Sequence, residues 1–218
     1  MHIACIHIPR FAVEAERQRS PKIATRLILI GEATVLDCSL GADPLGVRRG
    51  MRMSEGIALC PRAVVLPTDA PYYQRLFGEV LERLGELSPD IEPAEPGTAF
   101  MSLAGLEIEP KSFAEDLIAS VHKRLGLMAS VGIASGKFAA RVAAATSRPG
   151  VTKVIVSGDQ AAFLAPLPCM HLPASEAMLW RLKMLGVETM GEIAKLPLGA
   201  FQQLEPTLRL RQQRRDVV

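Results

Sequence analysis

The sequence has few cysteines, few aromatic residues and no long apolar run. Its 218 residues include four cysteines, one Trp, two Tyr and seven Phe. The cysteines stand far apart with no Cys-x-x-Cys pair, which argues against a disulfide framework or a zinc site. No apolar stretch approaches the roughly 20 residues of a membrane-spanning helix, and the start, MHIACIHIPRF, does not resemble a signal peptide. We therefore expect a soluble, cytoplasmic protein that does not bind membranes.

Acidic residues are missing from residues 117–158, although the chain as a whole carries a net charge of only +2. That segment contains Lys123, Arg124, Lys137, Arg141, Arg148 and Lys153, and a second basic cluster contains Arg48, Arg49 and Arg52. Basic segments in a nearly neutral chain predict a face that binds a polyanion. Solvated helix faces produce the same pattern, so both interpretations stay open here.

Motifs of several common enzyme classes are also missing. The sequence contains no Gly-x-Gly-x-x-Gly or Walker A pattern and no serine in a nucleophile elbow. His2, His122 and His171 are isolated, which favours ordinary core or surface roles over metal binding. These absences exclude the usual dinucleotide-binding, phosphate-loop and serine-hydrolase sites.

Hydrophobic periodicity predicts alternating strands and helices up to about residue 158. Strands are expected at residues 3–8, 26–30, 35–36, 63–66, 99–103, 128–133 and 151–156, and helices at 72–87, 112–125 and 137–146. Ser112 and Glu115 predict a capping box for the second helix. Two further helices are expected after residue 158, one capped by Ser175 and ended by Gly186, the other capped by Thr189 with Glu192. This order favours a layered α/β or α+β fold with helices on one face of a sheet.

Four segments resemble the Y-family DNA polymerases, and they occur in the family's order. They are LGVRRGMRMSEGIALCPRAVVLP (45–67), IEPAEPGTAFMSLAG (91–105), VGIASGKFAARVAAATSRPG (131–150) and LPASEAMLWRLKMLGVETMGEIAKLP (172–197). Each motif alone is weakly specific, whereas the ordered set is specific. The resemblance therefore implies that the chain is built like a Y-family polymerase.

The implied fold is α+β, with a ferredoxin-like polymerase palm at residues 1–30 and 71–158. A small α/β fingers insert would occupy 31–70, and a thumb-like helical module 159–208. Residues 209–218 show no apolar face and are expected to form a disordered basic tail. The sequence stops where the family's little-finger domain and sliding-clamp-binding segment would follow, which implies either a truncated product or a fragment.

The acids of a Y-family active site are replaced in this sequence. The family uses three carboxylates to hold two cations, and the matching positions carry His7, Gly97 and Thr98. Gly97 has no side chain that could bind a metal, and Thr98 provides only a neutral hydroxyl. The imidazole of His7 is a poor ligand for magnesium. Glu95 stands two residues away, about 6–7 Å along a strand, so its use would require a rebuilt site. The resemblance thus implies no catalytic residues, no metal site and no cofactor, with magnesium only if an unrecognised active site survives.

The nucleotide and DNA contacts are only partly retained. Lys137 matches a palm lysine that reaches the triphosphate, and Phe11 matches an aromatic residue near the nucleotide, so both are predicted as a vestigial triphosphate site. A solvated helix lysine and a core phenylalanine are the alternatives. Leu40 and Asp43 replace a Tyr and an Arg that face the triphosphate, and Ala12 replaces the residue that gates the sugar. The predicted DNA-binding residues are Lys137, Arg141, Arg148, Arg48, Arg49 and Arg52.

The His-Ile-Pro-Arg-Phe start and the Glu-Pro-x-x-Pro-Gly segment are similar to the ImuB-like branch, whose members lack the catalytic acids. This similarity implies a catalytically inactive accessory or scaffold protein in DNA repair, translesion synthesis and the SOS response to damage. Its expected partners are DNA, bound weakly and without sequence preference, and other damage-tolerance proteins: a RecA-like protein, an active polymerase or the sliding clamp. The alternatives are an active translesion polymerase with displaced metal ligands and a non-functional truncated product.

Overall fold

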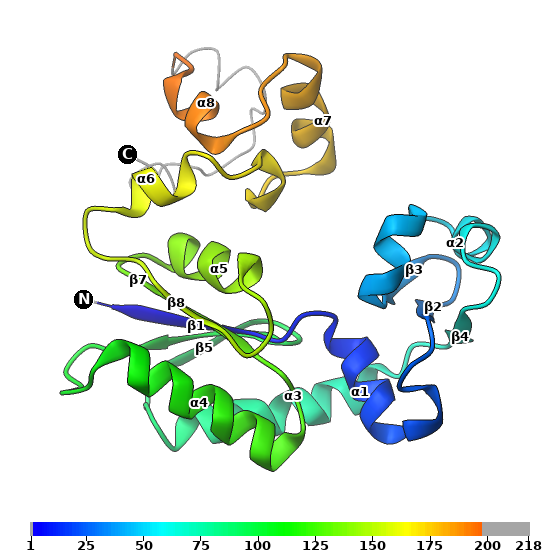
Figure 1. The fold of residues 1–218 in the computed structure, drawn as a ribbon, viewed down its shortest axis with the longest axis horizontal. Helices are drawn as coiled ribbons and strands as arrows, with labels where there is room; N and C mark the ends of the chain where they lie inside the picture. Colours follow the sequence, from blue (N-terminus) through cyan, green and yellow to red (C-terminus); the bar gives the residue numbers. More distant parts are fainter. Residues whose placement is uncertain (1, 198–218) are drawn as a thin grey trace.

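The computed structural model describes residues 2–197 and contains a five-stranded mixed sheet with the strand order β5–β6–β1–β7–β8 (Figure 1). The strands are β1 (Ile3–His7), β5 (Ile91–Glu95), β6 (Thr98–Ser102), β7 (Ser130–Ala134) and β8 (Thr152–Val154). Strand β8 runs parallel to β7, and the other pairs are antiparallel. The strands expected at residues 3–8, 99–103 and 128–133 thus lie in one sheet, as the implied palm fold requires.

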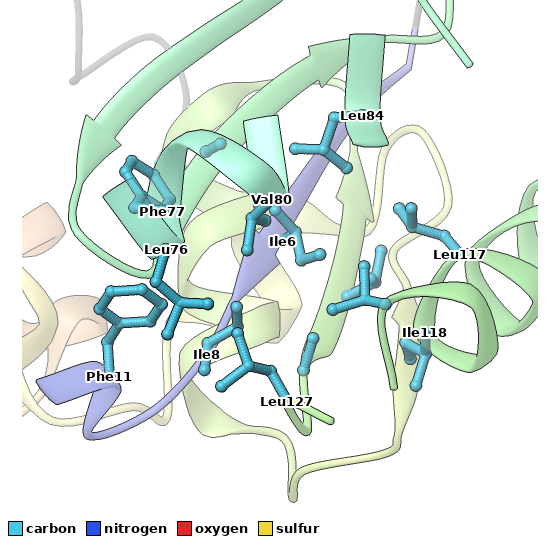
Figure 2. Packing of buried hydrophobic residues seen from close by; sticks show 14 of the residues in the cluster. Ile6, Ile8, Phe11, Leu76, Phe77, Val80, Leu84, Leu117, Ile118 and Leu127 are labelled. Carbon is cyan, nitrogen blue, oxygen red and sulfur yellow. The ribbon is translucent and has the colours of Figure 1, made fainter. Parts of the chain in front are cut away.

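Helices cover both faces of this sheet, so the prediction of helices on one face is wrong. Helices α3 (Ala70–Gly85) and α4 (Pro110–Leu125) cover one face, and α5 (Lys137–Thr146) covers the other (Figure 1). The reason lies in the period of a strand, whose alternate side chains point to opposite faces. On β1, Ile6 packs toward α3 and α4, as Figure 2 shows, whereas Cys5 packs toward α5.

Helix α5 lies unusually close to β7, because Gly132 has no side chain. A Cβ atom at this position would stand 2.1 Å from the carbonyl oxygen of Ala140 and 2.5 Å from the backbone nitrogen of Ala144. Only glycine permits this approach, and the alanines of α5 keep the helix surface flat. The close contact fixes the position of α5 over the middle of the sheet.

A second, three-stranded sheet has the order β3–β2–β4. Its strands are β2 (Ile28–Gly31), β3 (Val35–Cys38) and β4 (Val64–Leu66), and it carries helix α2 (Met53–Leu59) and the 3-10 helix η2 (Leu40–Leu45). Helix α1 (Phe11–Arg19) and the 3-10 helix η1 (Pro21–Ile23) connect the two sheets. Because β2 pairs within the second sheet, a boundary before residue 28 fits the pairing better than the predicted boundary after residue 30.

The helices after residue 158 are α6 (Gln160–Leu164), η3 (Cys169–His171), α7 (Glu176–Met184) and α8 (Met190–Lys195). Helices α7 and α8 begin at the predicted caps, and α6 and η3 were not predicted. Ser175 caps α7 by accepting a hydrogen bond from the backbone nitrogen of Met178, and Thr189 and Glu192 form the predicted capping box. Gly186 has a φ of 72°, as expected for a residue that ends a helix. Residues 198–218, including the predicted tail, lie outside the described part of the chain.

The predicted capping box at Ser112 is wrong. The N-cap of α4 is Glu109, whose carboxylate accepts hydrogen bonds from the backbone nitrogens of Lys111 and Ser112. Pro110 follows at the first helical position, where its missing N–H costs nothing. The helix therefore begins one turn earlier than Ser112 indicated.

Candidate functional site

The α5-facing side of the sheet contains the positions at which the sequence resemblance expects catalytic acids. His7 at the end of β1 lies opposite Thr98 at the start of β6. The Nδ1 atom of His7 and the hydroxyl oxygen of Thr98 are 3.0 Å apart and form a hydrogen bond. Thr98 is buried and His7 is half-buried, and burial lowers the pKa of His7 below its ordinary value. The pair is thus a neutral hydrogen-bonded contact.

Gly97 lies in the tight turn between β5 and β6. Its φ of +88° is a left-handed conformation that favours glycine, and its carbonyl oxygen accepts a 2.7 Å hydrogen bond from the backbone nitrogen of Ile8. A Cβ atom here would stand 2.7 Å from the Cβ of Phe11 and 2.9 Å from the carbonyl oxygen of Ile8. The turn therefore has no room for a carboxylate side chain at this position.

A β-bulge on β5 directs two carboxylates toward α5. Glu92 lies opposite Phe100 and Glu95 opposite Thr98, so Ala94 is the extra residue of the bulge. Residues three apart on a regular strand face opposite sides. The extra residue of the bulge turns Glu92 and Glu95 toward the same side of the sheet. Both carboxylates therefore reach basic residues of α5.

The two predicted DNA-binding residues of α5 are engaged by these carboxylates. Lys137 and Arg141 are one helical turn apart, and Lys137 forms an ion pair with Glu92. Arg141 Nη2 lies 2.6 Å from Glu95 Oε1. All four side chains remain between 44% and 61% exposed, so these are surface ion pairs accessible to solvent. We call Glu92, Glu95, Lys137 and Arg141 the α5 charge cluster.

A second group of charges joins the loop after β1 to the three-stranded sheet. Arg10 donates from Nη2 to both carboxylate oxygens of Asp43, at 2.6 Å each, and its Nη1 lies 3.7 Å from Asp37 Oδ1. Arg10 has a φ of 55°, which makes it the one non-glycine residue with a positive φ among residues 2–197. Its strained backbone and paired side chain fix the loop against β3 and η2.

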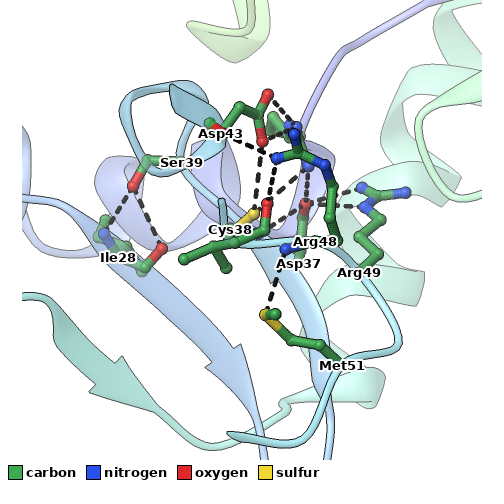
Figure 3. A network of polar contacts seen from close by, with 10 residues as sticks. Ile28, Asp37, Cys38, Ser39, Asp43, Arg48, Arg49 and Met51 are labelled. Atoms are coloured by element: carbon green, nitrogen blue, oxygen red, sulfur yellow. Dashed lines mark hydrogen bonds and ion pairs between the residues drawn. The ribbon is translucent and has the colours of Figure 1, made fainter. Parts of the chain in front are cut away.

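Arg49 and Arg48 complete this network, as Figure 3 shows. Arg49 donates from Nε and Nη2 to Asp37 Oδ1 at 3.1 and 2.8 Å. The Asp37 side chain is only 2% exposed, and these arginine partners offset the cost of burying its carboxylate. Arg48 donates to the carbonyl oxygens of Asp43 and Val47. Arg49 thus links the loop after η2 to β3, and Arg48 links the same loop to η2.

The remaining predicted site residues are scattered. Arg52 and Arg148 are exposed. Phe11 is 3% exposed and packs edge-to-face on Phe77, with ring centroids 5.7 Å apart. Phe11 and Ala12 also line a cavity of about 260 Å³ whose other walls include Asp37. The structure therefore brings Lys137 and Arg141 together, and it places Phe11 in the core.

The comparisons with known proteins agree with this architecture. The profile of the impB/mucB/samB family matches residues 6–145, from β1 to the end of α5. The chain belongs to the impB/mucB/samB family. The predicted resemblance to the Y-family polymerases and the predicted α+β fold are confirmed by this match and by the proteins described next.

Curated relatives of this family member are DNA polymerases. DNA polymerase IV 2 of Mesorhizobium japonicum (strain LMG 29417 / CECT 9101 / MAFF 303099) is 30% identical over 201 residues, which cover 89% of this chain and 48% of the relative. DNA polymerase IV of Dehalococcoides mccartyi (strain CBDB1) is 28% identical over 213 residues, which cover 90% of this chain and 54% of the relative. The chain thus spans about half the length of the curated relatives it matches.

Solved structures share the fold at lower identity. The crystal structure of DinB from Sulfolobus solfataricus superposes with a TM-score of 0.83 at 20% identity, and covers 94% of this chain and 63% of that chain. The insertion ternary complex of Dbh DNA polymerase gives a TM-score of 0.84 at 19% identity, with 100% of this chain and 68% of that chain covered. These structures establish the fold of the impB/mucB/samB member described here.

Sequence reasoning missed the acidic partners in both charge groups. Glu92 and Glu95 lie on a strand that was not predicted, and their common orientation depends on the bulge. Arg10 follows a proline in a short loop, where no periodicity marks it. Among residues 2–197, no group of three or more His, Cys, Asp and Glu side chains could hold a metal ion. No helix in the same range is both long and apolar enough to cross a membrane.

Proposed function

We propose that this family member is a catalytically inactive Y-family polymerase homologue that acts as an accessory or scaffold in DNA damage tolerance and translesion synthesis. The observation that carries the proposal is the geometry of the β5–β6 turn. Gly97 stands at an acid position, and its φ and close neighbours leave no space for a carboxylate. An inactive member of the ImuB-like branch fits this turn better than an active polymerase does.

The residues near the turn do not fit a two-metal site. His7 uses Nδ1 for its hydrogen bond to Thr98, whose hydroxyl is neutral. Glu95 is the nearest acid in the sequence, and its carboxylate is paired with Arg141. Magnesium prefers several charged or carbonyl oxygen ligands at about 2 Å. We therefore derive no metal-dependent step for this chain.

The charges at the positions where the resemblance expects triphosphate contacts also argue against triphosphate binding. Asp43 occupies the position at which the resemblance expects an arginine, and it holds Arg10. Lys137, the expected phosphate ligand, is paired with Glu92. A triphosphate would have to displace this carboxylate and approach Asp37 and Asp43, which repel it. These charges thus favour the inactive homologue over an active polymerase.

A primer-extension assay tests the proposal directly. With magnesium or manganese, all four nucleotides and a DNA polymerase IV as the positive control, we expect no template-dependent incorporation. Incorporation by the wild-type chain that is abolished by Glu95→Ala would overturn the proposal and support displaced metal ligands. Incorporation that survives Glu95→Ala would overturn it as well, and would place the activity on other residues.

A thermal melt in magnesium gives an independent measurement. A site with a Kd near 1 mM would stabilise the fold by about 1.4 kcal/mol at 10 mM magnesium, a shift of roughly 3–6 °C in a chain of this size. We expect no shift beyond that of a matched ionic strength, with or without a nucleoside triphosphate. A rise of several degrees that requires the triphosphate would contradict the proposal.

The accessory role includes weak, sequence-independent binding to DNA. Lys137, Arg141 and Arg148 would contact phosphates, with Arg48, Arg49 and Arg52 as further candidates. Each neutralised duplex phosphate contributes about −0.9 to the slope of log K against log salt, so we expect a slope of about −2 to −4. A fluorescence anisotropy titration at several salt concentrations measures it. Affinity that does not depend on salt, or no binding at low salt, would contradict this role.

A further inference from the structure

The α5 charge cluster contains two carboxylates at the place where a phosphate group would bind. Glu92 and Glu95 share one face of β5 only because Ala94 forms a bulge between them. Without the bulge, one of the two carboxylates would point away from α5. The strand is thus shaped to present a pair of acids to a pair of bases.

The acids use the donors that a phosphate would need. Arg141 directs Nη2 at Glu95 with a separation of 2.6 Å, and the Lys137 ammonium contacts Glu92. A phosphate oxygen bound to these groups would occupy the position of the carboxylate oxygens. While the ion pairs persist, a nucleic-acid backbone also meets two negative charges at this surface.

The ion pairs are weak enough to be exchanged. Their side chains are 44–61% exposed, and ion pairs exposed to solvent in this way contribute little to stability. A dense polyanion that releases counterions on binding can therefore displace them. An isolated anion at low concentration gains too little to do so.

We infer that Glu92 and Glu95 form an acidic cover that competes with nucleic-acid phosphates for Lys137 and Arg141. The inference rests on the proposed DNA binding and assigns a regulation to that same surface. The cover lowers the affinity for DNA and reduces the number of phosphates bound. A basic partner segment that pairs with the two carboxylates in place of Lys137 and Arg141 therefore increases DNA binding.

The variant Glu92→Gln/Glu95→Gln tests the cover, because it keeps the side-chain shapes and removes the charges. With a fluorescent duplex at low salt, we expect tighter binding, by up to about 5-fold for each carboxylate removed. The salt slope should steepen by up to about 1.8, since two further phosphates become neutralised. A melting curve of each variant checks that the fold is intact.

Glu86→Gln is the matched control. Glu86, the C-cap residue of α3, is 51% exposed and pairs with Arg124 at 3.1 Å and with Arg83. The substitution therefore removes the same charge and frees two arginines, Arg83 and Arg124, away from the α5 charge cluster. We expect less than a 2-fold change in affinity, by the weak long-range effect of one exposed charge.

A second comparison separates the specific contact from a general charge effect. In an Arg141→Gln background, the gain from Glu95→Gln should disappear, because no guanidinium remains to be released. A gain of the same size in that background would overturn the inference, as would equal gains for Glu86→Gln and Glu95→Gln.

The outcomes for the cover and for the proposed DNA binding can be told apart. DNA binding by the wild-type chain with no gain in Glu92→Gln/Glu95→Gln would overturn the cover and leave the DNA-binding proposal intact. Binding only in the double variant would support the cover in its strongest form. No binding by any variant at the lowest salt would overturn both.

Discussion

Restoring an acid at Gly97 is the most direct test of how far the β5–β6 turn has diverged from a metal-binding strand. The Gly97→Asp substitution places a Cβ atom on a backbone with φ +88°. The left-handed conformation costs a non-glycine residue about 1–2 kcal/mol. The contacts at 2.7 Å with Phe11 and 2.9 Å with Ile8 add overpacking of about 1–3 kcal/mol. Together, the two costs predict that the free energy of unfolding falls by about 2–5 kcal/mol.

Gly105→Asp provides the control for the backbone contribution. Gly105 has a φ of +79°, and nothing lies within 4 Å of a Cβ atom built there. The Gly105→Asp variant should lose only the stability that the left-handed backbone conformation costs, about 1–2 kcal/mol. At about 2–4 °C per kcal/mol, the melting temperature should fall by roughly 4–20 °C for Gly97→Asp and 2–8 °C for Gly105→Asp. Urea denaturation of the two variants and the wild type gives the same comparison isothermally.

Equal losses of stability in the two variants would show that the crowding around Gly97 is relieved at no cost. A Gly97→Asp variant with the stability of the wild type would refute the turn geometry itself. The triple variant His7→Asp/Gly97→Asp/Thr98→Glu extends the test to activity. Because the turn has no space for the middle acid, we expect it to remain inactive in primer extension. A stable triple variant that extends primers would refute the reasoning.

Further substitutions address the sheet, the Arg10 network and the buried histidine. Gly132→Ala should destabilise the fold by about 3 kcal/mol or more, because its Cβ would stand 2.1 Å from the backbone oxygen of Ala140; a melting temperature within 2–3 °C of the wild type would contradict this. Arg10→Gln and Asp43→Asn should each cost about 1–2 kcal/mol, and the double variant little more than either, because the pair is half-buried; additive losses in urea unfolding would show that the two are not coupled. Burial lowers the pKa of His7, so the unfolded state takes up the proton first, and stability should fall as the pH drops below about 6.5. Urea unfolding at pH 7.5 and 5.5 should show a smaller acid loss for His7→Gln than for the wild type, and an equal loss would argue against this titration.

The central elements could be predicted because each buries a clear apolar pattern. The strand β1 and the helix α5 have strong periodicity, and α5 begins and ends at the predicted residues. The edge strand β5 was missed because it contains Pro93 and two glutamates and is mostly exposed. Helix α1 was missed because its nine residues include Glu14, Arg17 and other charged side chains, so local sequence shows little apolar face.

In the α5 charge cluster, the sequence predicted the two basic residues but not the acidic residues that pair with them. Lys137 and Arg141 stand one turn apart in a segment without acids, which the sequence displays directly. Their partners come from a strand about 45 residues earlier in the chain, and a bulge decides their orientation. The position of the Arg49 side chain likewise depends on its ion pair with the buried Asp37. Contacts of this kind arise from tertiary packing, and no local pattern encodes them.

The central position of β1 has a consequence for how the chain folds during synthesis. Its neighbours are β6 and β7, whose paired residues lie 91–99 and 123–131 positions further along the chain. At about 5–20 residues per second, a ribosome needs roughly 5–25 s to make these partners after β1. Until β6 has been made, Ile3–His7, a strand that lies in the middle of the finished sheet, has unpaired edges on both sides, and one edge stays unpaired until β7 follows. Folding of the five-stranded sheet must therefore wait for β7, and the nascent strand is a natural client for a chaperone that binds extended apolar segments.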